Sequence, residues 1–94
     1  MSHASQSAVH LLIQGRVQGV GFRYFVQEQA VKLQLVGWVR NLPGGQVEAY
    51  AEGARTDLES WRTQLRQGPP LSRVEKVEED WQTPTGTTKT FSIV

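Results

Sequence analysis

Residues 15 to 23 read GRVQGVGFR, and this stretch joins a strand pattern to a helix pattern. Its glycines, Gly15, Gly19 and Gly21, allow backbone N–H groups to converge on one point, as they do in loops that hold anions. Arg23 follows in the first turn of the predicted helix, where a cation opposes the positive end of the helix dipole. An anion bound beside Arg23 resolves that conflict. The stretch therefore predicts a phosphate-sized anion site between a strand and a helix.

The segments on either side of this loop have clear periodicity. Residues 8–14, AVHLLIQ, alternate apolar and mixed positions and predict a strand covered mainly on one face. We interpret His10 in this strand as structural, because no second His, Asp or Glu lies nearby in the sequence. From about residue 22 to 33, apolar residues recur at helical spacing and predict a helix with one buried stripe: Phe22, Phe25, Val26, Ala30 and Leu33.

Residues 35–53 are typical of a β-hairpin. Two alternating segments, 35–41 and 46–53, flank the sequence LPGG at 42–45, whose proline and paired glycines favour a tight turn. Beyond the hairpin, Thr56 and Glu59 form a capping-box pattern at the start of a second amphipathic helix, which ends before a Gly-Pro-Pro sequence.

The last third of the chain predicts strands. Residues 72–82 read as a long strand, although Val74 and Val77 have opposite parity, which indicates a bulge or a twist. KTFSIV, residues 89–94, predicts a short edge strand at the C-terminus.

The resulting order is strand, helix, strand, strand, helix, strand. With right-handed crossovers this order gives an α+β, ferredoxin-like βαββαβ sandwich, in which both helices cover one face of an antiparallel sheet. A short C-terminal edge strand completes the expected sheet. We expect residues 1–7 to form a flexible N-terminal tail and residues 8–94 to form a single domain.

Composition excludes several classes of function. Ten Lys and Arg residues against nine Asp and Glu give a formal net charge of +1, far from the basic surface of a nucleic-acid binder. The chain has no cysteine, which excludes a thiolate zinc site and a cysteine-phosphate intermediate. No apolar run approaches membrane-spanning length, and the N-terminus lacks a signal-peptide pattern. We therefore expect a cytoplasmic protein that binds neither nucleic acid nor membrane, and we also expect a monomer.

Asn41 is the polar residue that the hairpin brings toward the glycine loop. Its amide can hold a water in line for attack without titrating. The other interpretation, that an asparagine before a Pro-Gly-Gly turn serves only the backbone, stays open. The loop lacks the Gly-Lys-Ser/Thr ending of a nucleotide-binding loop, and no paired aspartates nearby suit magnesium. These observations favour a metal-free reaction on a small phosphate. The acidic residues of segment 75–80 indicate a solvated edge rather than a calcium site.

Two stretches, GRVQGVGFR and GWVRNLPGGQVEAYAEG, resemble the acylphosphatase family in residues, order and separation. GPPLSRVEKVE and the closing FSIV are also similar to that family, so the resemblance covers about residues 8–94. It implies hydrolysis of acyl phosphates to a carboxylate and inorganic phosphate, without metal or cofactor. Arg23 matches the family's phosphate-binding arginine, and Asn41 matches the asparagine that positions the attacking water. The family's phosphate-binding loop matches Arg16, Val17, Gln18, Gly19, Val20, Gly21 and Phe22, next to Arg23.

The sequence departs from the family at two positions outside these motifs. Gln34 stands where glycine commonly follows the first helix, which predicts a non-glycine residue in a left-handed cap and a cost of about 1 kcal/mol in stability. The hairpin turn reads LPGG where an Asp-Gly pair is frequent. A catalytically silent phosphate- or metabolite-binding module remains the alternative, as does one domain of a larger carbamoyl-transferring protein, which the short chain disfavours. RNA recognition through Trp38 and Tyr50 is disfavoured by the neighbouring glutamates.

Overall fold

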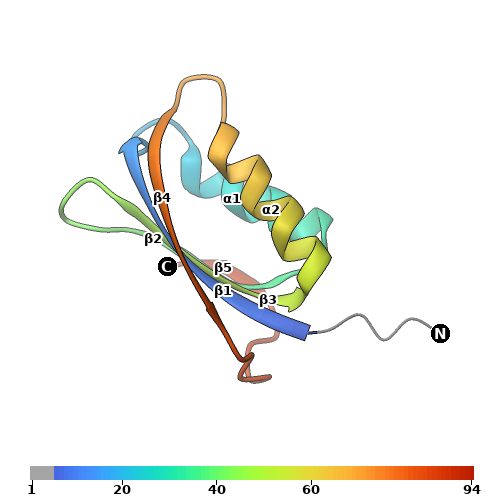
Figure 1. The fold of residues 1–94 in the computed structure, drawn as a ribbon. Coiled ribbons are helices and arrows are strands. Elements are labelled where there is room, and N and C mark those ends of the chain that lie inside the picture. Colours follow the sequence, from blue (N-terminus) through green and yellow to red (C-terminus); the bar gives the residue numbers. More distant parts are fainter. Residues whose placement is uncertain (1–5) are drawn as a thin grey trace.

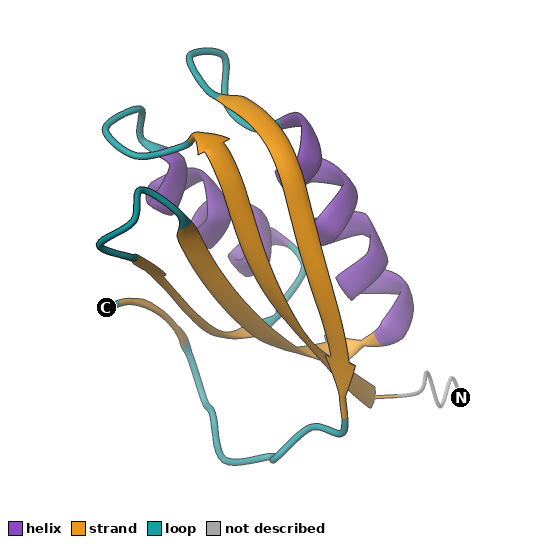
Figure 2. Ribbon diagram, turned by 60° about the vertical axis from the view of Figure 1, so that its left-hand side comes forward, coloured by secondary structure: helices purple, strands orange, loops and turns teal. Residues whose placement is uncertain are grey.

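The computed structural model describes residues 6–94 as a five-stranded sheet with two helices packed on one face (Figures 1 and 2). Its elements, in chain order, are β1 (Gln6–Arg16), α1 (Phe22–Lys32), β2 (Val36–Asn41), β3 (Val47–Ala54), α2 (Arg55–Gln67), β4 (Arg73–Gln82) and β5 (Phe91–Ile93). The strand order is β4-β1-β3-β2-β5. The predicted ferredoxin-like fold is confirmed. The predicted edge strand is also confirmed, and it pairs in parallel with β2.

β1 starts at Gln6, so two residues of the expected tail belong to the sheet. The rest of that tail, residues 1–5, lies outside the described residues. In the part of the chain that the structure describes, neither helix is long and apolar enough to cross a membrane.

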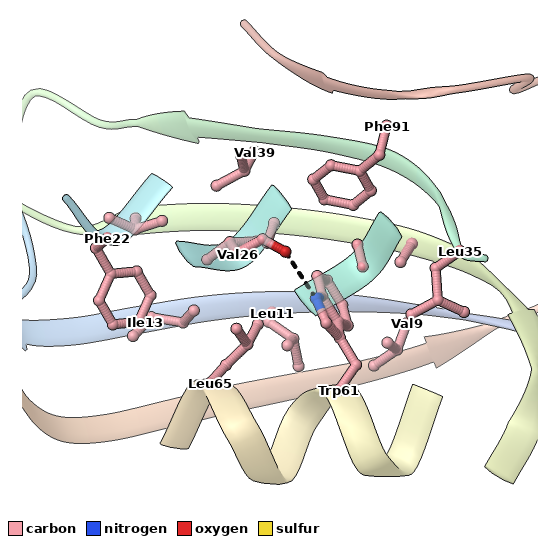
Figure 3. Packing of buried hydrophobic residues seen from close by; sticks show 14 of the residues in the cluster. Val9, Leu11, Ile13, Phe22, Val26, Leu35, Val39, Trp61, Leu65 and Phe91 are labelled. Atoms are coloured by element: carbon pink, nitrogen blue, oxygen red, sulfur yellow. Dashed lines mark hydrogen bonds between the residues drawn. The ribbon is translucent and has the colours of Figure 1, made fainter. Parts of the chain in front are cut away.

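The core lies between the sheet and the helices, and it follows from the alternation in β1. Val9, Leu11 and Ile13 are fully buried on the helix-facing side. Trp61 of α2 reaches across this layer, and its indole N–H donates a 3.2 Å hydrogen bond to the carbonyl oxygen of Val26 in α1 (Figure 3). This bond satisfies the polar atom of a fully buried aromatic side chain. It fixes the two helices relative to each other above the sheet.

A bulge in β4 confirms the prediction made from the parity of its valines. Gln14 of β1 is opposite Lys76, but the next residue, Gly15, is opposite Val74, so Glu75 is extra. The extra residue reverses the alternation. Val74 and Val77 both pack against the core as a result.

The predicted capping box at the start of α2 is wrong. β3 continues to Ala54, which is itself the N-cap residue of α2, and no side chain caps the helix. Thr56 therefore lies inside the first turn instead of at the cap. The strand passes into the helix without a loop, so there is no separate capping position for a threonine to fill.

Gln34 has a φ of 58°, the left-handed conformation predicted for the position after α1. Its N–H donates to the carbonyl of Val31, while the N–H of Leu35 donates to Ala30. A side chain in this conformation brings Cβ close to the following carbonyl, at a cost of about 1–2 kcal/mol. The helix end is thus well bonded but strained at one residue.

The face of the sheet that the helices leave open carries polar and aromatic side chains. His10 pairs with Glu48 at 2.6 Å, and the rings of Trp38 and Tyr50 stack on each other with centroids 6.0 Å apart. Glu52, only 5% exposed, accepts hydrogen bonds from Tyr50 and from the loop between β4 and β5. His10 therefore has an acidic partner on β3 that is distant in the sequence, and its structural role stays a prediction.

Three connections gather at one end of the sheet: the β1–α1 loop, the β2–β3 turn and the α2–β4 connection (Figures 1 and 2). The turn closes through a 3.1 Å bond from the N–H of Gly45 to the carbonyl of Leu42, which confirms the predicted tight turn. The predicted anion loop and the hairpin are therefore neighbours in space, although they are far apart in sequence.

Candidate active site

The β1–α1 loop owes its shape to two glycines. Gly19 and Gly21 have φ values of 75° and 76°, which side-chain-bearing residues rarely adopt. A Cβ atom at either position would meet no other atom within 4 Å. The backbone conformation, and not lack of space, therefore requires glycine here, and open space lies directly over this part of the main chain.

The amides around the start of α1 lack internal acceptors. Gly21 is the N-cap residue, no side chain caps the helix, and its first turn contains no acidic residue. Within residues 6–94, the first intrahelical bond is from Phe25 to Gly21, and no N–H from Gly19 to Tyr24 donates to another group. Free N–H groups at the positive end of a helix are a ready site for an anion. The loop thus has the donors that the sequence predicts.

Arg23 adds a full positive charge beside these amides. It forms no ion pair with any carboxylate in the described part of the chain, whereas Arg40, Arg62 and Arg66 each pair with a glutamate. Its guanidinium fork matches the geometry of phosphate oxygens. The lack of an internal partner leaves this fork available to a ligand.

Asn41 is the last residue of β2, and its position in the strand decides where its side chain points. It shares the parity of Val39, which is fully buried on the helix-facing side. The Asn41 side chain therefore lies on the same side of the sheet as α1. Its Oδ1 atom is buried and has no hydrogen-bond partner among the described residues. An unpaired buried acceptor is costly, so its presence points to a water or ligand that it binds.

These groups line one cavity of about 90 Å³. Arg23 and Asn41, the two predicted catalytic residues, both line it, so the structure brings them together from α1 and β2. Four predicted loop residues share that lining with them: Val17, Gly19, Gly21 and Phe22. The volume is that of about three waters, enough for a tetrahedral oxyanion. Phe22 is 1% exposed and anchors the helix start in the core.

The three remaining residues of the predicted loop lie outside the cavity lining. Arg16 is exposed at the end of β1, opposite Arg73. Val20 packs against the core. Gln18 turns its side chain away and donates to two carbonyls of the β2–β3 turn, those of Leu42 and Gln46, at 2.8 and 2.9 Å. Gln18 thereby connects the loop to the hairpin that contains Asn41.

Tyr24 also lines the cavity, and sequence reasoning missed it. The signal was present, because Tyr24 lies off the apolar stripe of α1 and in the same first turn as Arg23. Its side chain is 68% exposed, which places an aromatic ring at the cavity mouth.

Comparison with known proteins identifies the family. The sequence model of the acylphosphatase family matches residues 9–93. An acylphosphatase of Thermococcus kodakarensis is 53% identical over 77 residues, 82% of this chain and 85% of the relative. The crystal structure of acylphosphatase from Bacillus subtilis superposes with a TM-score of 0.91 at 41% identity, covering 94% of this chain and 98% of that one.

A structure of full-length HypF is also similar, with a TM-score of 0.82 and 30% identity over 96% of this chain and 12% of that chain. The motif residues around Arg23 and Asn41 thus occur in a chain whose fold and sequence agree with these relatives over nearly its whole described length. The chain belongs to the acylphosphatase family.

Proposed function

We propose that this acylphosphatase cleaves the carboxyl–phosphate anhydride bond of acyl phosphates by direct in-line attack of water, without metal and without a covalent enzyme intermediate. One observation carries the proposal. A single small cavity combines the unpaired guanidinium of Arg23, the free amides that start α1 and the unpaired buried oxygen of Asn41. Two of these groups suit a phosphoryl anion, and the third suits a water.

Arg23 and the loop amides bind the phosphoryl group. The transferred phosphoryl group develops and redistributes negative charge over its equatorial oxygens in the transition state. Donors already fixed around that position stabilise the charge without reorganising. The loop between β1 and α1 holds its amides through the conformations of Gly19 and Gly21, so they are in place before substrate arrives.

Asn41 positions the nucleophile. Its buried Oδ1 accepts a hydrogen bond from the attacking water and directs the water's lone pair toward phosphorus. Because an amide does not titrate near neutral pH, Asn41 orients the water without removing its proton.

The bond changes balance without further reagents. A bond forms between the water oxygen and phosphorus, while the bond between phosphorus and the acyl oxygen breaks. The carboxylate leaves with the electron pair, and the water's protons remain on the inorganic phosphate. A carboxylate is a good leaving group, so no strong general acid is needed. We expect the bound phosphoryl group to accept the proton, and a flat rate profile through the pH range in which it titrates would count against this step.

Acyl phosphate hydrolysis tests the proposal directly. Purified wild-type protein is incubated with acetyl phosphate in the presence of EDTA, and release of inorganic phosphate is measured against a no-enzyme control. We expect sustained turnover, and loss of most activity in Arg23→Ala. Binding of phosphate without any turnover would instead identify the non-catalytic binding module. Full activity of Arg23→Ala would overturn the site assignment.

The proposal also covers the domain organisation, the oligomeric state and the cellular location of the protein. We propose that residues 8–94 act as one catalytic domain, since the core forms one cluster that contains residues from both helices and from β1, β2, β3 and β5. We further propose a cytoplasmic monomer, because residues of one chain, Arg23 and Asn41 among them, are enough to form the cavity. Light scattering at assay concentration tests the monomer.

A further inference from the structure

A groove of about 720 Å³ runs beside the phosphate cavity, between α1 and the α2–β4 connection. One wall is the exposed side of α1, with Tyr24 and Val31, and the other is Pro69 and Pro70. We propose that this groove binds the acyl group of the substrate and that it favours extended apolar acyl groups over acetyl. This inference rests on the proposed function, and it names the substrate class that the site takes.

The groove and the cavity adjoin each other. Gly21 and Tyr24 line both of them, at the start of α1. The groove and the cavity are adjacent because the α2–β4 connection lies beside the β1–α1 loop at this end of the sheet (Figure 1). A molecule whose phosphoryl group fills the cavity therefore has a path for its other end along the groove.

The geometry of the reaction selects the same path. In-line displacement places the leaving group opposite the attacking water. Asn41, which holds the water, lines the cavity but not the groove, and the groove opens at the edge formed by Gly21 and Tyr24. We place the acyl oxygen on the side away from Asn41, so that the acyl group extends past Tyr24 into the groove.

The chemistry of the lining indicates an apolar acyl group. The described residues include four exposed large hydrophobic side chains, of which Tyr24 at 68% and Val31 at 59% line the groove. A third, Leu71, directly follows Pro70 in the chain. Exposed apolar groups concentrated in one place mark binding surfaces. The groove also carries Glu28 and Lys32, whose charges cancel, so it offers no net charge to an ionic acyl group.

The length of the groove distinguishes among apolar acyl groups. Its lining follows α1 from Gly21 to beyond Val31, which is about 15 Å of helix at the usual rise per residue. An acetyl group reaches only the first part of this distance. A longer acyl chain extends over Tyr24 toward Val31 and buries more apolar surface.

A chain-length series tests the assignment. The value of kcat/KM is measured for acetyl, butanoyl, octanoyl and dodecanoyl phosphate, each below the concentration at which it self-associates. Burial of a methylene strengthens binding about fourfold when complete, and a groove open on one side gives about twofold for each methylene. We expect kcat/KM to rise about twofold per methylene, chiefly through a lower KM, until the chain reaches Val31.

Val31→Ser and Val94→Ser form a matched pair of variants. Both valines are exposed, at 59% and 66%, but only Val31 lines the groove. We expect Val31→Ser to flatten the series for its longest members and to leave acetyl phosphate turnover unchanged, whereas Val94→Ser follows the wild type. Val31→Ile, which keeps an apolar side chain at this position, should retain the wild-type dependence of kcat/KM on acyl chain length.

A flat wild-type series, or equal series for the two serine variants, overturns the groove assignment while acetyl phosphate turnover keeps the proposed function intact. An equal loss for every substrate in Val31→Ser also overturns it, because that result assigns the effect to the fold. Absence of acetyl phosphate turnover in the wild type is a different failure, that of the proposed function itself.

Discussion

The side-chain amide of Gln18 donates a 2.8 Å hydrogen bond to the carbonyl oxygen of Leu42, the residue that follows Asn41. The same nitrogen donates to the carbonyl of Gln46 at 2.9 Å. One glutamine therefore connects the β1–α1 loop to both ends of the β2–β3 turn. The donors that we propose for phosphate and the group that we propose for the water come from different elements, and Gln18 links those elements directly.

Removal of these two bonds should impair catalysis more than stability. In Gln18→Met, the carbonyls of Leu42 and Gln46 keep their backbone partners, so we expect unfolding free energy to fall by about 1 kcal/mol or less. A displacement of about 1 Å between Asn41 and the loop costs about a hundredfold in rate. We expect kcat/KM for acetyl phosphate to fall tenfold to a hundredfold, as measured by phosphate release.

Gln14→Met is the control for this variant, because Gln14 also donates through its side-chain amide, to Glu78 at 2.9 Å, but at an exposed site on β1. It should retain wild-type kcat/KM. If Gln18→Met also does so, Gln18 does not position the site.

Replacement of Gln34 by glycine should stabilise the protein. The left-handed φ of 58° at this position favours glycine, and the relief of strain exceeds the greater flexibility of glycine in the unfolded chain. We expect Gln34→Gly to raise the unfolding free energy by about 1 kcal/mol in urea titrations, with unchanged activity. Gln34→Ala keeps the Cβ atom and should not raise the unfolding free energy. Equal stabilisation by both variants would show that the backbone at Gln34 is not strained.

Glu52 should make stability depend on pH in the acid range. Burial by itself raises the pKa of Glu52, but hydrogen bonds from Tyr50, Thr85 and Gly86 outweigh it and lower the pKa to about 2. The folded pKa is thus below the usual glutamate value of 4.5, so the carboxylate contributes its full stabilisation above about pH 4.5. That contribution is lost as the pH falls toward 2.

Glu52→Gln measures this contribution. We expect it to lower the unfolding free energy by about 1–3 kcal/mol at pH 7 and by much less near pH 2, where the wild-type carboxylate takes up its proton. Urea unfolding at a series of pH values provides the comparison, with Glu59→Gln at an exposed ion pair as the control. If the difference in unfolding free energy between wild type and Glu52→Gln is the same at pH 7 and near pH 2, the charge of Glu52 does not contribute to stability.

Local sequence patterns predict the fold and the positions of the two candidate site residues, whereas the role of Asn41 comes from the family resemblance. Strand parity places Val39 and Asn41 on one face, and the helix pattern that starts at Phe22 places Arg23 in the first turn. Both rules are local, so a single sequence suffices to apply them. The bulge in β4 was equally visible in the parity of Val74 and Val77.

Other features depend on where distant segments meet. The bonds of Gln18 need carbonyls whose positions are set by the conformation of the β2–β3 turn, and the groove needs Pro69 and Pro70 to lie opposite α1. No periodicity encodes either arrangement. The capping box failed for a related reason, because β3 extends to Ala54 and removes the loop in which Thr56 would cap.

In the proposed mechanism Arg23 binds the phosphoryl group and Asn41 orients the water, and Asn41→Ala separates these two roles. The Asn41 side chain makes no hydrogen bond within residues 6–94, so its truncation breaks none and should leave the fold intact. The measurement is kcat for acetyl phosphate hydrolysis in EDTA, together with the inhibition constant of inorganic phosphate. We predict that kcat falls about 10²- to 10³-fold, while phosphate inhibits as in the wild type. A kcat that is retained, or a loss of phosphate affinity that accounts for the whole effect, would contradict the role of Asn41 in holding the water.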